Sequence, residues 1–325
     1  MKTRIAFIGA GKMANAVHYP SLASFEDVEI TGICDLDEGR LKETADKYNI
    51  PRRYTNYRKM ADAEKPDGMY VIGPAHNMYD IVIWCLENKI PVFVEKPLGL
   101  NYHQASMLTE LADKNKVITQ VCHQRRSSPL LLAVLEKCKS HGHINHAVCE
   151  FYKYDMNPMY SACDHIHDDC SHSVDTLRSI CGGEVINIES SCKKIGTPDI
   201  NWVQAVLNFD NGSTGILINS WASGRRVFRL ELHAPGIYSD VEIENKAYLY
   251  ANGDYEGKVF DAKEISGGND LYIYGGFKNK SREFIDSLQS GKEQTTSPFK
   301  DVLKTMLVVE LITANALHHT FKQRR

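Results

Sequence analysis

The chain has 325 residues, of which 43% are hydrophobic and 24% charged, as is ordinary for a globular protein. This is about twice the ~150 residues of a typical domain, so we expect two domains. The formal net charge of -3 and the lack of a long basic run argue against a nucleic-acid partner. We also expect no membrane span and no signal peptide. Nine cysteines without a C-x-x-C pair indicate reduced thiols, so we predict a cytoplasmic protein.

The first 121 residues alternate short apolar runs with helical patterns. Near-continuous apolar runs predict strands buried on both faces, at 4–9, 28–35, 68–73, 91–96 and 116–121. Apolar residues recur every three or four positions over the predicted helices 12–25, 37–49, 78–89 and 101–115. The repeated β-α-β order predicts an α/β fold with a doubly wound parallel sheet. We assign residues 1–122 to this Rossmann-type domain.

The pattern changes after residue 122. Helices are predicted around 128–138 and 170–181 and, at the end of the chain, at 277–291 and 297–317. Extended or alternating segments are predicted at 144–154, 201–210, 212–221, 226–234, 236–244 and 246–251. Turn signals such as Asn211-Gly212 favour antiparallel hairpins. We therefore expect residues 123–325 to form an α+β domain with a mainly antiparallel open sheet, covered by helices on one face.

A glycine-rich turn follows the first predicted strand. Gly9 and Gly11 stand in a G-x-G-x-x-A pattern that opens a helix, where a tight turn and close backbone approach suit a pyrophosphate. Asp35 closes the second strand, where a carboxylate accepts hydrogen bonds from an adenosine ribose. A carboxylate also repels a 2'-phosphate, so we predict NAD rather than NADP as the cofactor.

A second motif, VFVEKPLGL at 92–100, ends another buried strand. Glu95 and Lys96 lie at the carboxyl end of that strand, where open α/β sheets bind ligands. The residue before a proline is confined to extended geometry, so Lys96 is held more rigidly than a surface lysine. This favours a function for Lys96.

The segment DHIHDDCSHSVD at 164–175 permits two chemistries. His165, His167 and His172 stand among aspartates, a residue mix that suits either a metal site or proton transfer. If 165 and 167 are extended, their imidazoles face one way and His172 can complete a three-ligand site. On a helix, Asp168 and His172 instead share a face, as do His172 and Asp175.

The chain resembles the glucose-fructose oxidoreductase, inositol dehydrogenase and MocA family (Gfo/Idh/MocA). The matching features run along most of the sequence: GAGKMA, ICD ending at Asp35, KPDGMYVIGPAH, VFVEKPLGL, HQRRSSP, the Asp168, His172 and Asp175 pattern, and LRSICGG. The resemblance implies a Rossmann domain, a substrate-binding domain with a large open sheet, and a homodimer or homotetramer built through that sheet.

The resemblance also implies catalytic roles for Lys96, Asp168 and His172. In the family, the lysine contacts the reacting hydroxyl beside the nicotinamide, while the aspartate and histidine face it from the other domain. A histidine has a pKa suited to accepting the hydroxyl proton, and a lysine can stabilise the developing alkoxide. Asp168 would then hold a neighbouring hydroxyl of a sugar or polyol. No metal is needed in this mechanism.

We expect NAD to contact Gly9, Gly11, Lys12, Met13, Asp35, Pro74, His76, Glu95 and Lys96. Candidate substrate residues are Arg125, Tyr154, His165 and His167, and either Arg125 or Arg126 could instead pair with an acid. The sequence departs from the family in the loop before Asp168, which carries Cys163 and Asp164, and at Gln124, where relatives have asparagine.

Three functions remain open. The first is an NAD-dependent dehydrogenase acting on a sugar, cyclitol or related polyol. The second is a glycosidase that oxidises a sugar hydroxyl transiently with bound NAD. The third is a non-catalytic dinucleotide-sensing regulator, which is disfavoured because Lys96, Asp168 and His172 are all present.

Overall fold

The computed structural model describes residues 1–322, and the chain divides into two compact units. The first unit contains Met1–Gln124 and Asp270–Leu303. The second contains Arg125–Asn269 and the chain from Lys304 onward. Within the described residues, no helix is long and apolar enough to cross a membrane.

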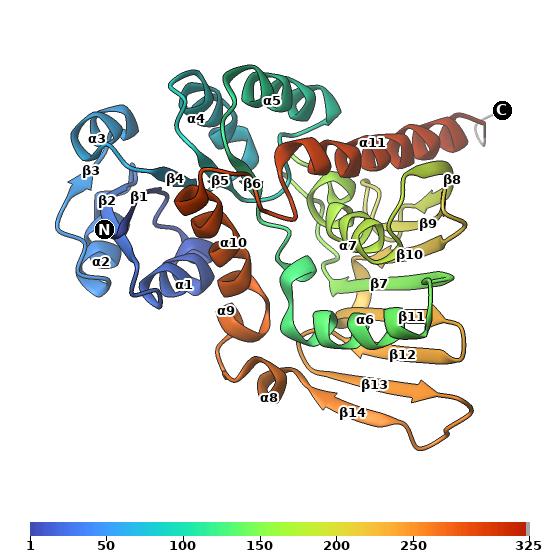
Figure 1. Ribbon diagram of the computed structural model, residues 1–325. Helices are drawn as coiled ribbons and strands as arrows, with labels where there is room; N and C mark the ends of the chain where they lie inside the picture. The colour runs from blue at the N-terminus through green and yellow to red at the C-terminus, as the bar shows by residue number, and fades with distance from the viewer. Residues whose placement is uncertain (323–325) are drawn as a thin grey trace. The chain divides into compact units, whose positions relative to one another are not determined.

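The first unit is built on a six-stranded parallel sheet in the order β3-β2-β1-β4-β5-β6 (Figure 1). Its strands are β1 (Thr3–Ile8), β2 (Val28–Cys34), β3 (Arg53–Tyr54), β4 (Gly68–Val71), β5 (Val92–Val94) and β6 (Thr119–Val121). The connecting helices are η1 (Ala14–His18), α1 (Tyr19–Ala23), α2 (Glu38–Lys47), α3 (Tyr57–Glu64), α4 (Ala75–Glu87) and α5 (Tyr102–Asn115). The predicted doubly wound sheet is confirmed. Its strand order reverses between β1 and β4, which is where such folds bind ligands.

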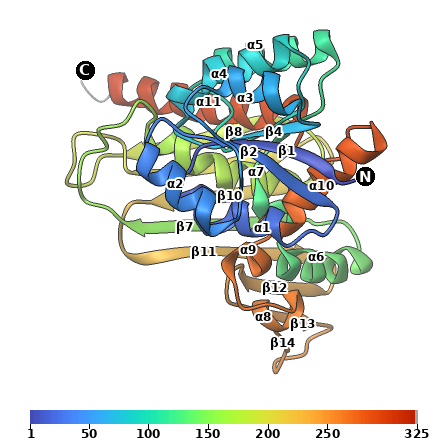
Figure 2. The same cartoon turned by 90° about the vertical axis from the view of Figure 1, so that its left-hand side faces the viewer.

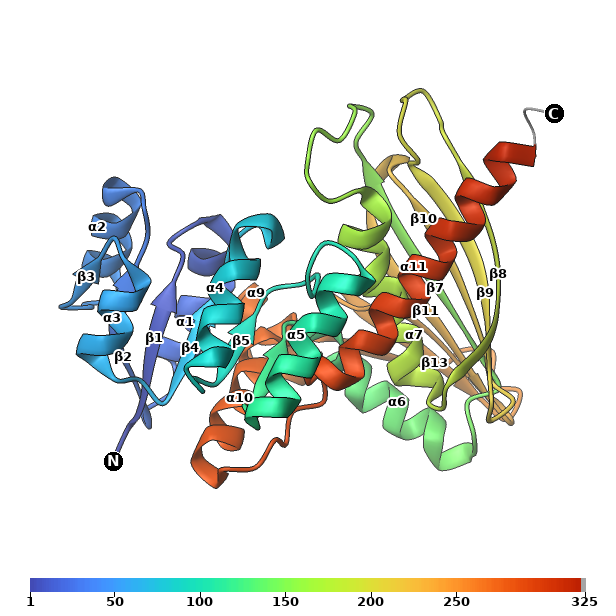
Figure 3. The same ribbon diagram turned by 90° about the horizontal axis from the view of Figure 1, so that it is seen from above.

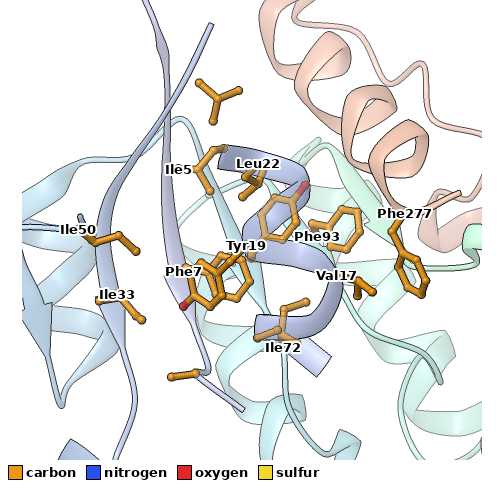
Figure 4. Close-up of a cluster of buried hydrophobic side chains, with 14 of the residues drawn as sticks. Ile5, Phe7, Val17, Tyr19, Leu22, Ile33, Ile50, Ile72, Phe93 and Phe277 are labelled. Carbon is orange, nitrogen blue, oxygen red and sulfur yellow. The ribbon is translucent and has the colours of Figure 1, made fainter. Parts of the chain in front are cut away.

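Stacked aromatic rings form the centre of this unit's core (Figure 4). The ring centroids of Phe7 and Tyr19 are 4.0 Å apart, and those of Tyr70 and Phe93 are 4.2 Å apart. These rings join β1 to α1 and β4 to β5. Such buried aromatic pairs contribute about 0.5–1.5 kcal/mol each beyond the area they bury, so they stabilise the packing of the strands whose ends adjoin the candidate site.

Residues 270–303, which the sequence analysis assigned to the second domain, pack in the first unit. They form α9 (Leu271–Tyr274) and α10 (Phe277–Ser290), and α10 adds Phe277, Phe284 and Ile285 to the core of the first unit. Figures 1 and 4 show α10 and its Phe277 next to α1 and this core. The apolar stripe of α10 predicts a buried helix face, but it does not reveal which sheet covers that face.

The second unit is built on an eight-stranded sheet in the order β14-β13-β12-β11-β7-β10-β9-β8. Its strands are β7 (His146–Tyr154), β8 (Val185–Lys193), β9 (Trp202–Phe209), β10 (Thr214–Ser220), β11 (Ala222–Ala234), β12 (Ile237–Glu242), β13 (Lys246–Ala251) and β14 (Lys258–Asp261). Figure 2 shows β7, β11 and β12 next to one another. All pairs are antiparallel except β7 with β10, so the predicted mainly antiparallel sheet is confirmed.

Helices cover one face of this sheet (Figure 3). The helical segments of the unit are η2 (Gln124–Ser127), α6 (Pro129–His141), η3 (Ile166–Cys170), α7 (Ser171–Cys181), α8 (Ala262–Ser266) and most of α11 (Phe299–Lys322). The α7 helix packs on β7 and β10, and α6 packs on β11 and β12. Along β7, Ala147, Cys149 and Phe151 are buried beneath these helices, whereas the alternate side chains are half-buried.

Candidate functional site

The turn after β1 requires glycine. Gly9 has a φ of +103°, and a Cβ atom there would lie 1.9 Å from the carbonyl oxygen of Ile72. The Tyr19 hydroxyl donates a hydrogen bond to the Gly9 carbonyl at 3.0 Å, which ties the turn to the aromatic core. At Gly11, by contrast, a Cβ atom would meet nothing within 4 Å, so open space lies beside this backbone.

Asp35 lies directly after β2 and is anchored to the same turn. Its carboxylate accepts hydrogen bonds from the backbone N–H groups of Ala10 at 2.7 Å and Asp37 at 2.8 Å. Arg40 Nη2 donates to it at 3.2 Å. Burial acts to raise the pKa of Asp35, but these hydrogen bonds hold it below its ordinary value. The carboxylate is therefore ionised and fixed in direction at neutral pH.

A cavity of about 940 Å³ lies at the carboxyl edge of the parallel sheet. Its wall contains four of the predicted cofactor residues, namely Gly9, Gly11, Asp35 and Pro74. The volume is in the range of small-molecule sites, and the position is the ligand crevice of doubly wound folds. The glycine turn, the open space at Gly11 and the oriented Asp35 carboxylate fit the pyrophosphate and ribose of NAD.

Other predicted cofactor residues lie outside this cavity wall. Lys12 and Met13 are exposed in the helical residues that lead into η1, and His76 is exposed in the first turn of α4. The wall also contains residues that the sequence analysis did not single out: Leu36, Arg40, Asn56, Tyr57, Arg58, Asn77, Met78 and Ile81. The sequence could have revealed Arg40 as a cavity residue, because it lies in the first turn of the helix that follows Asp35.

Glu95 and Lys96 directly follow β5. His18 Nε2 lies 2.6 Å from Glu95 Oε1, and the Lys96 backbone N–H donates to Glu95 Oε2 at 3.1 Å. Burial acts to raise the pKa of Glu95, but His18 and Lys96 hold it below its ordinary value. A second, smaller cavity is lined by Glu95 and Pro97. Two residues line both this cavity and the larger one: Gly73 and Met78. The Glu-Lys-Pro segment thus adjoins the candidate cofactor cavity.

Asp168 and His172 lie in the second unit, on consecutive helical segments. Asp168 belongs to η3, which is a π-helix, and is half-buried. His172 is buried in α7, and its ring meets the Phe151 ring edge-on with 6.2 Å between centroids. The expectation that residues 168 and 172 share a face assumed α-helical spacing, which the structure has only from Ser171 onward.

Asp175 and Arg126 form a buried ion pair. Arg126 Nε donates to Asp175 Oδ2 at 2.7 Å, and Nη2 donates to Oδ1 at 2.5 Å. The Thr305 hydroxyl also donates to Asp175 at 3.1 Å. The pair therefore connects η2, α7 and α11, and Asp175 is the acid with which Arg126 pairs.

The other predicted substrate residues have different surroundings. Tyr154 ends β7 with 73% of its surface exposed. His167 is buried, with Nδ1 at 2.8 Å from Asp164 and Nε2 at 3.2 Å from Glu310. Both ring nitrogens of His167 thus face carboxylates of this chain, which leaves neither of them for a substrate.

His165 belongs to a cluster that sequence reasoning missed. Its ring stacks on Trp221 with centroids 4.5 Å apart, and Nε2 lies 3.3 Å from Asp199 Oδ2. Trp221 Nε1 donates to Asp169 at 2.8 Å, and Lys153 donates to the same carboxylate oxygen at 2.6 Å. The cluster joins β7, η3 and the start of β11. Its contacts are non-local, so no sequence spacing signals it.

The metal alternative for the three histidines has no support in this geometry. In the part of the chain that the structure describes, the one group of three potential ligands with atoms within 4.8 Å of one another is His18, Glu95 and Cys122. Two members of this group, His18 and Glu95, are close together because they are hydrogen-bonded to each other. His165, His167 and His172 do not form such a group.

Residues 3–123 match the model of the Gfo/Idh/MocA family, described as an oxidoreductase family with an NAD-binding Rossmann fold. The chain is 24% identical over 317 residues to myo-inositol 2-dehydrogenase of Thermotoga maritima, covering 90% of each sequence. Among solved structures it resembles a Gfo/Idh/MocA family oxidoreductase from Vibrio cholerae, with a TM-score of 0.84, 17% identity and 100% of both chains covered. It also resembles an oxidoreductase from Agrobacterium radiobacter in complex with NAD+, L-tartaric acid and magnesium, with a TM-score of 0.83, 20% identity and 98% and 97% coverage. Residues 3–123 therefore form an NAD-binding Rossmann domain of the Gfo/Idh/MocA oxidoreductase type, and over its whole length the chain has the fold of a solved Gfo/Idh/MocA family oxidoreductase.

Proposed function

We propose that the protein is a dehydrogenase that transfers a hydride between a secondary hydroxyl of a sugar, cyclitol or related polyol and the nicotinamide of NAD. The observation that carries this proposal is the position of Lys96. It follows β5 at the carboxyl edge of the sheet, between Glu95 and Pro97, and both of these neighbours line a small cavity that shares Gly73 and Met78 with the candidate cofactor cavity. The similarity to myo-inositol 2-dehydrogenase supports a polyol substrate.

In the proposed reaction, Gly9, Gly11 and Asp35 would hold NAD+, which would supply the hydride acceptor, while other side chains of this chain bind the substrate and take up its proton. The His172 imidazole accepts the hydroxyl proton, since its ordinary pKa lies near neutral pH. The Lys96 ammonium stabilises the negative charge that develops on the oxygen. Asp168 accepts a hydrogen bond from a neighbouring hydroxyl and so orients the ring. Glu95, held by His18, keeps a negative charge beside Lys96.

A substrate screen tests the proposal. The purified protein is mixed with NAD+ and a panel of sugars, inositols and sugar derivatives, and formation of NADH is followed by absorbance. We expect NADH to accumulate with at least one polyol, in an amount proportional to the polyol consumed. Cleavage of a glycoside without net NADH would instead indicate the glycosidase alternative. Tight NAD binding with neither outcome would count against both enzymes and favour the regulator.

A double-mutant cycle tests the catalytic residues. General-base contributions are typically ~10² to 10⁴ in rate, so His172→Ala should lower turnover by that order. Lys96→Met keeps the aliphatic stem without the charge and should lower turnover comparably. Because both groups act on one proton transfer, the double mutant should lose less than the product of the two losses. NAD affinity should change far less than turnover. Near-normal turnover in both single mutants would refute the assignment.

We further propose that the protein is cytoplasmic and forms a homodimer or homotetramer through the face of the eight-stranded sheet that α6 and α7 leave uncovered. Half-buried side chains of several strands line that face, including Tyr152, Ile218 and Tyr238. Light scattering after size exclusion should report two or four chains. Replacing Ile218 by arginine should shift the protein toward the monomer, and an unchanged mass would argue against this interface.

A further inference from the structure

Arg125 has an unusual environment for a charged side chain. It is 4% exposed, and its Cζ lies 4.0 Å from the Phe228 ring centroid and 5.4 Å from that of Phe151. Within the described chain, its Nε and Nη1 atoms have no hydrogen-bond partner. Burial lowers its pKa to about 10, so the guanidinium is still protonated at neutral pH. A buried cation with unpaired donors calls for an acceptor from outside the protein.

The acids near Arg125 are engaged by other cations. Glu244 lies close enough to Arg125 for the arginine to affect the pKa of the glutamate. Burial acts to raise the pKa of Glu244, but Arg226 and Arg125 hold it below its ordinary value. However, Arg226 occupies both oxygens of Glu244, with Nη1 at 2.8 Å from Oε2 and Nη2 at 3.3 Å from Oε1. The other cations of this region pair with acids of their own: Lys153 with Asp169, Arg126 with Asp175 and Arg225 with Glu242. Arg125 therefore carries a positive charge that no hydrogen-bonded acid balances.

This charge lies close to the candidate catalytic histidine. The Phe151 ring lies next to both residues. Its centroid is 5.4 Å from Arg125 Cζ and 6.2 Å from the centroid of the His172 ring. Beside it, the pairing of β7 with β11 is interrupted between Ala222 and Val227. Such irregularities are frequent next to active sites. The interruption borders a cavity of about 170 Å³ whose wall includes Phe228 and Glu244, both neighbours of Arg125.

We propose that Arg125 is an anion-binding residue of the substrate site and that the substrate carries a carboxylate or a phosphate group. The substrate class is then a sugar acid or a sugar phosphate. The guanidinium stacks on Phe228, so its edge is left to pair with an acceptor in the guanidinium plane. This inference rests on the proposed function, because it places the anion on the molecule whose hydroxyl loses its proton to His172.

Matched ligands test the inference. Binding is measured by calorimetry in the presence of NAD+ for four pairs: D-glucuronate and D-glucose, D-galacturonate and D-galactose, D-gluconate and D-glucitol, and glucose 6-phosphate and glucose. We expect the acidic member of at least one pair to bind about tenfold or more tightly, as a charge-assisted hydrogen bond predicts. The phosphate pair distinguishes a phosphate from a carboxylate ligand. If no acid binds more tightly than its neutral partner, the inference is overturned.

Variants identify the residue responsible. Arg125→Met should abolish the preference for the acid while leaving the weak binding of the neutral sugar, and Arg125→Lys should retain part of the preference. Arg225→Met is the matched control, because Arg225 lies on the neighbouring irregularity but is exposed and paired with Glu242. It should leave the preference intact. Equal loss of acid and neutral binding in both Arg125 variants would overturn the inference.

The binding measurement separates this inference from the proposed function. Selective binding of an acid that depends on Arg125, without any reduction of NAD+, would support the anion site and refute the dehydrogenase. Turnover of neutral polyols in preference to acids would support the dehydrogenase and refute the anion site.

Discussion

Neutralising Asp35 should weaken the discrimination between NAD and NADP. The carboxylate is fixed by the backbone N–H groups of Ala10 and Asp37, so it cannot turn away from a 2'-phosphate. Two unit charges at about 4 Å interact with roughly 1 kcal/mol in water and roughly 4 kcal/mol near a protein surface. Arg40, at 3.2 Å from the carboxylate, offsets part of that repulsion. We therefore expect NADP to bind about tenfold to a hundredfold more weakly than NAD, or roughly 1.4 to 2.8 kcal/mol.

The assay is a fluorescence titration of NAD and NADP with the wild type, Asp35→Asn and Arg40→Ala. Asparagine keeps the shape and one carbonyl acceptor, so the ratio of the two affinities should fall toward one while the glycine turn persists. Arg40→Ala is the opposing control and should increase the preference for NAD, because the offsetting charge is removed. The reasoning is refuted if the wild type binds NADP more tightly, or if Asp35→Asn leaves the ratio unchanged.

Three further outcomes are expected. Asp175→Asn should lower the free energy of unfolding by about 3–5 kcal/mol, the cost of leaving a buried charge without its partner. Urea unfolding measures this loss, and combining Asp175→Leu with Arg126→Met should restore most of the stability. Burial acts to lower the pKa of His167, but Asp164 and Glu310 raise it above 6.5. Protonated His167 should therefore stabilise the folded protein fully below pH 6.5, and this contribution should be lost as the pH rises through the folded-state pKa. The stability difference between wild type and His167→Gln, followed from about pH 5 to pH 9, should therefore shrink at high pH, and a constant difference would contradict this. Finally, activity should survive chelation, because Lys96 supplies the positive charge that a metal would otherwise supply; loss of activity with EDTA and its return with one metal would contradict this.

The parallel sheet could be predicted because its strands are buried on both faces and read as continuous apolar runs. The strand β3 was missed, since Arg53 and Tyr54 are only two residues and pair at the sheet edge with Ile33 and Cys34. The edge strand β8 was missed for a related reason. Its side chains are exposed or half-buried throughout, and even Ile186 is 68% exposed, so no apolar pattern marks it.

The candidate residues of the cofactor and substrate sites also differ in whether the sequence could reveal them. Gly9 and Asp35 could be predicted because a glycine turn and a carboxylate at successive strand ends follow from the fold itself. Arg125 could be noticed only as one of two adjacent arginines. Whether Arg125 pairs with an acid depends on Glu244, which lies more than 100 positions later in the sequence. The carboxylate of Glu244 is already hydrogen-bonded to Arg226. Such competition among distant side chains leaves no local signal.

The two π-helical segments show where helical periodicity fails near the site. One, η1, follows the glycine turn and ends at His18, which holds Glu95 beside Lys96. The other, η3, contains Asp168 and leads into the helix of His172. A π-helix closes its hydrogen bonds over five residues rather than four, so it rotates the side chains relative to a regular α-helix, and such segments are frequent at functional sites. A period of 3.6 residues therefore misplaces the directions of both His18 and Asp168. The proposed chemistry depends on those two directions, because one sets the charge next to Lys96 and the other sets which hydroxyl is held beside His172.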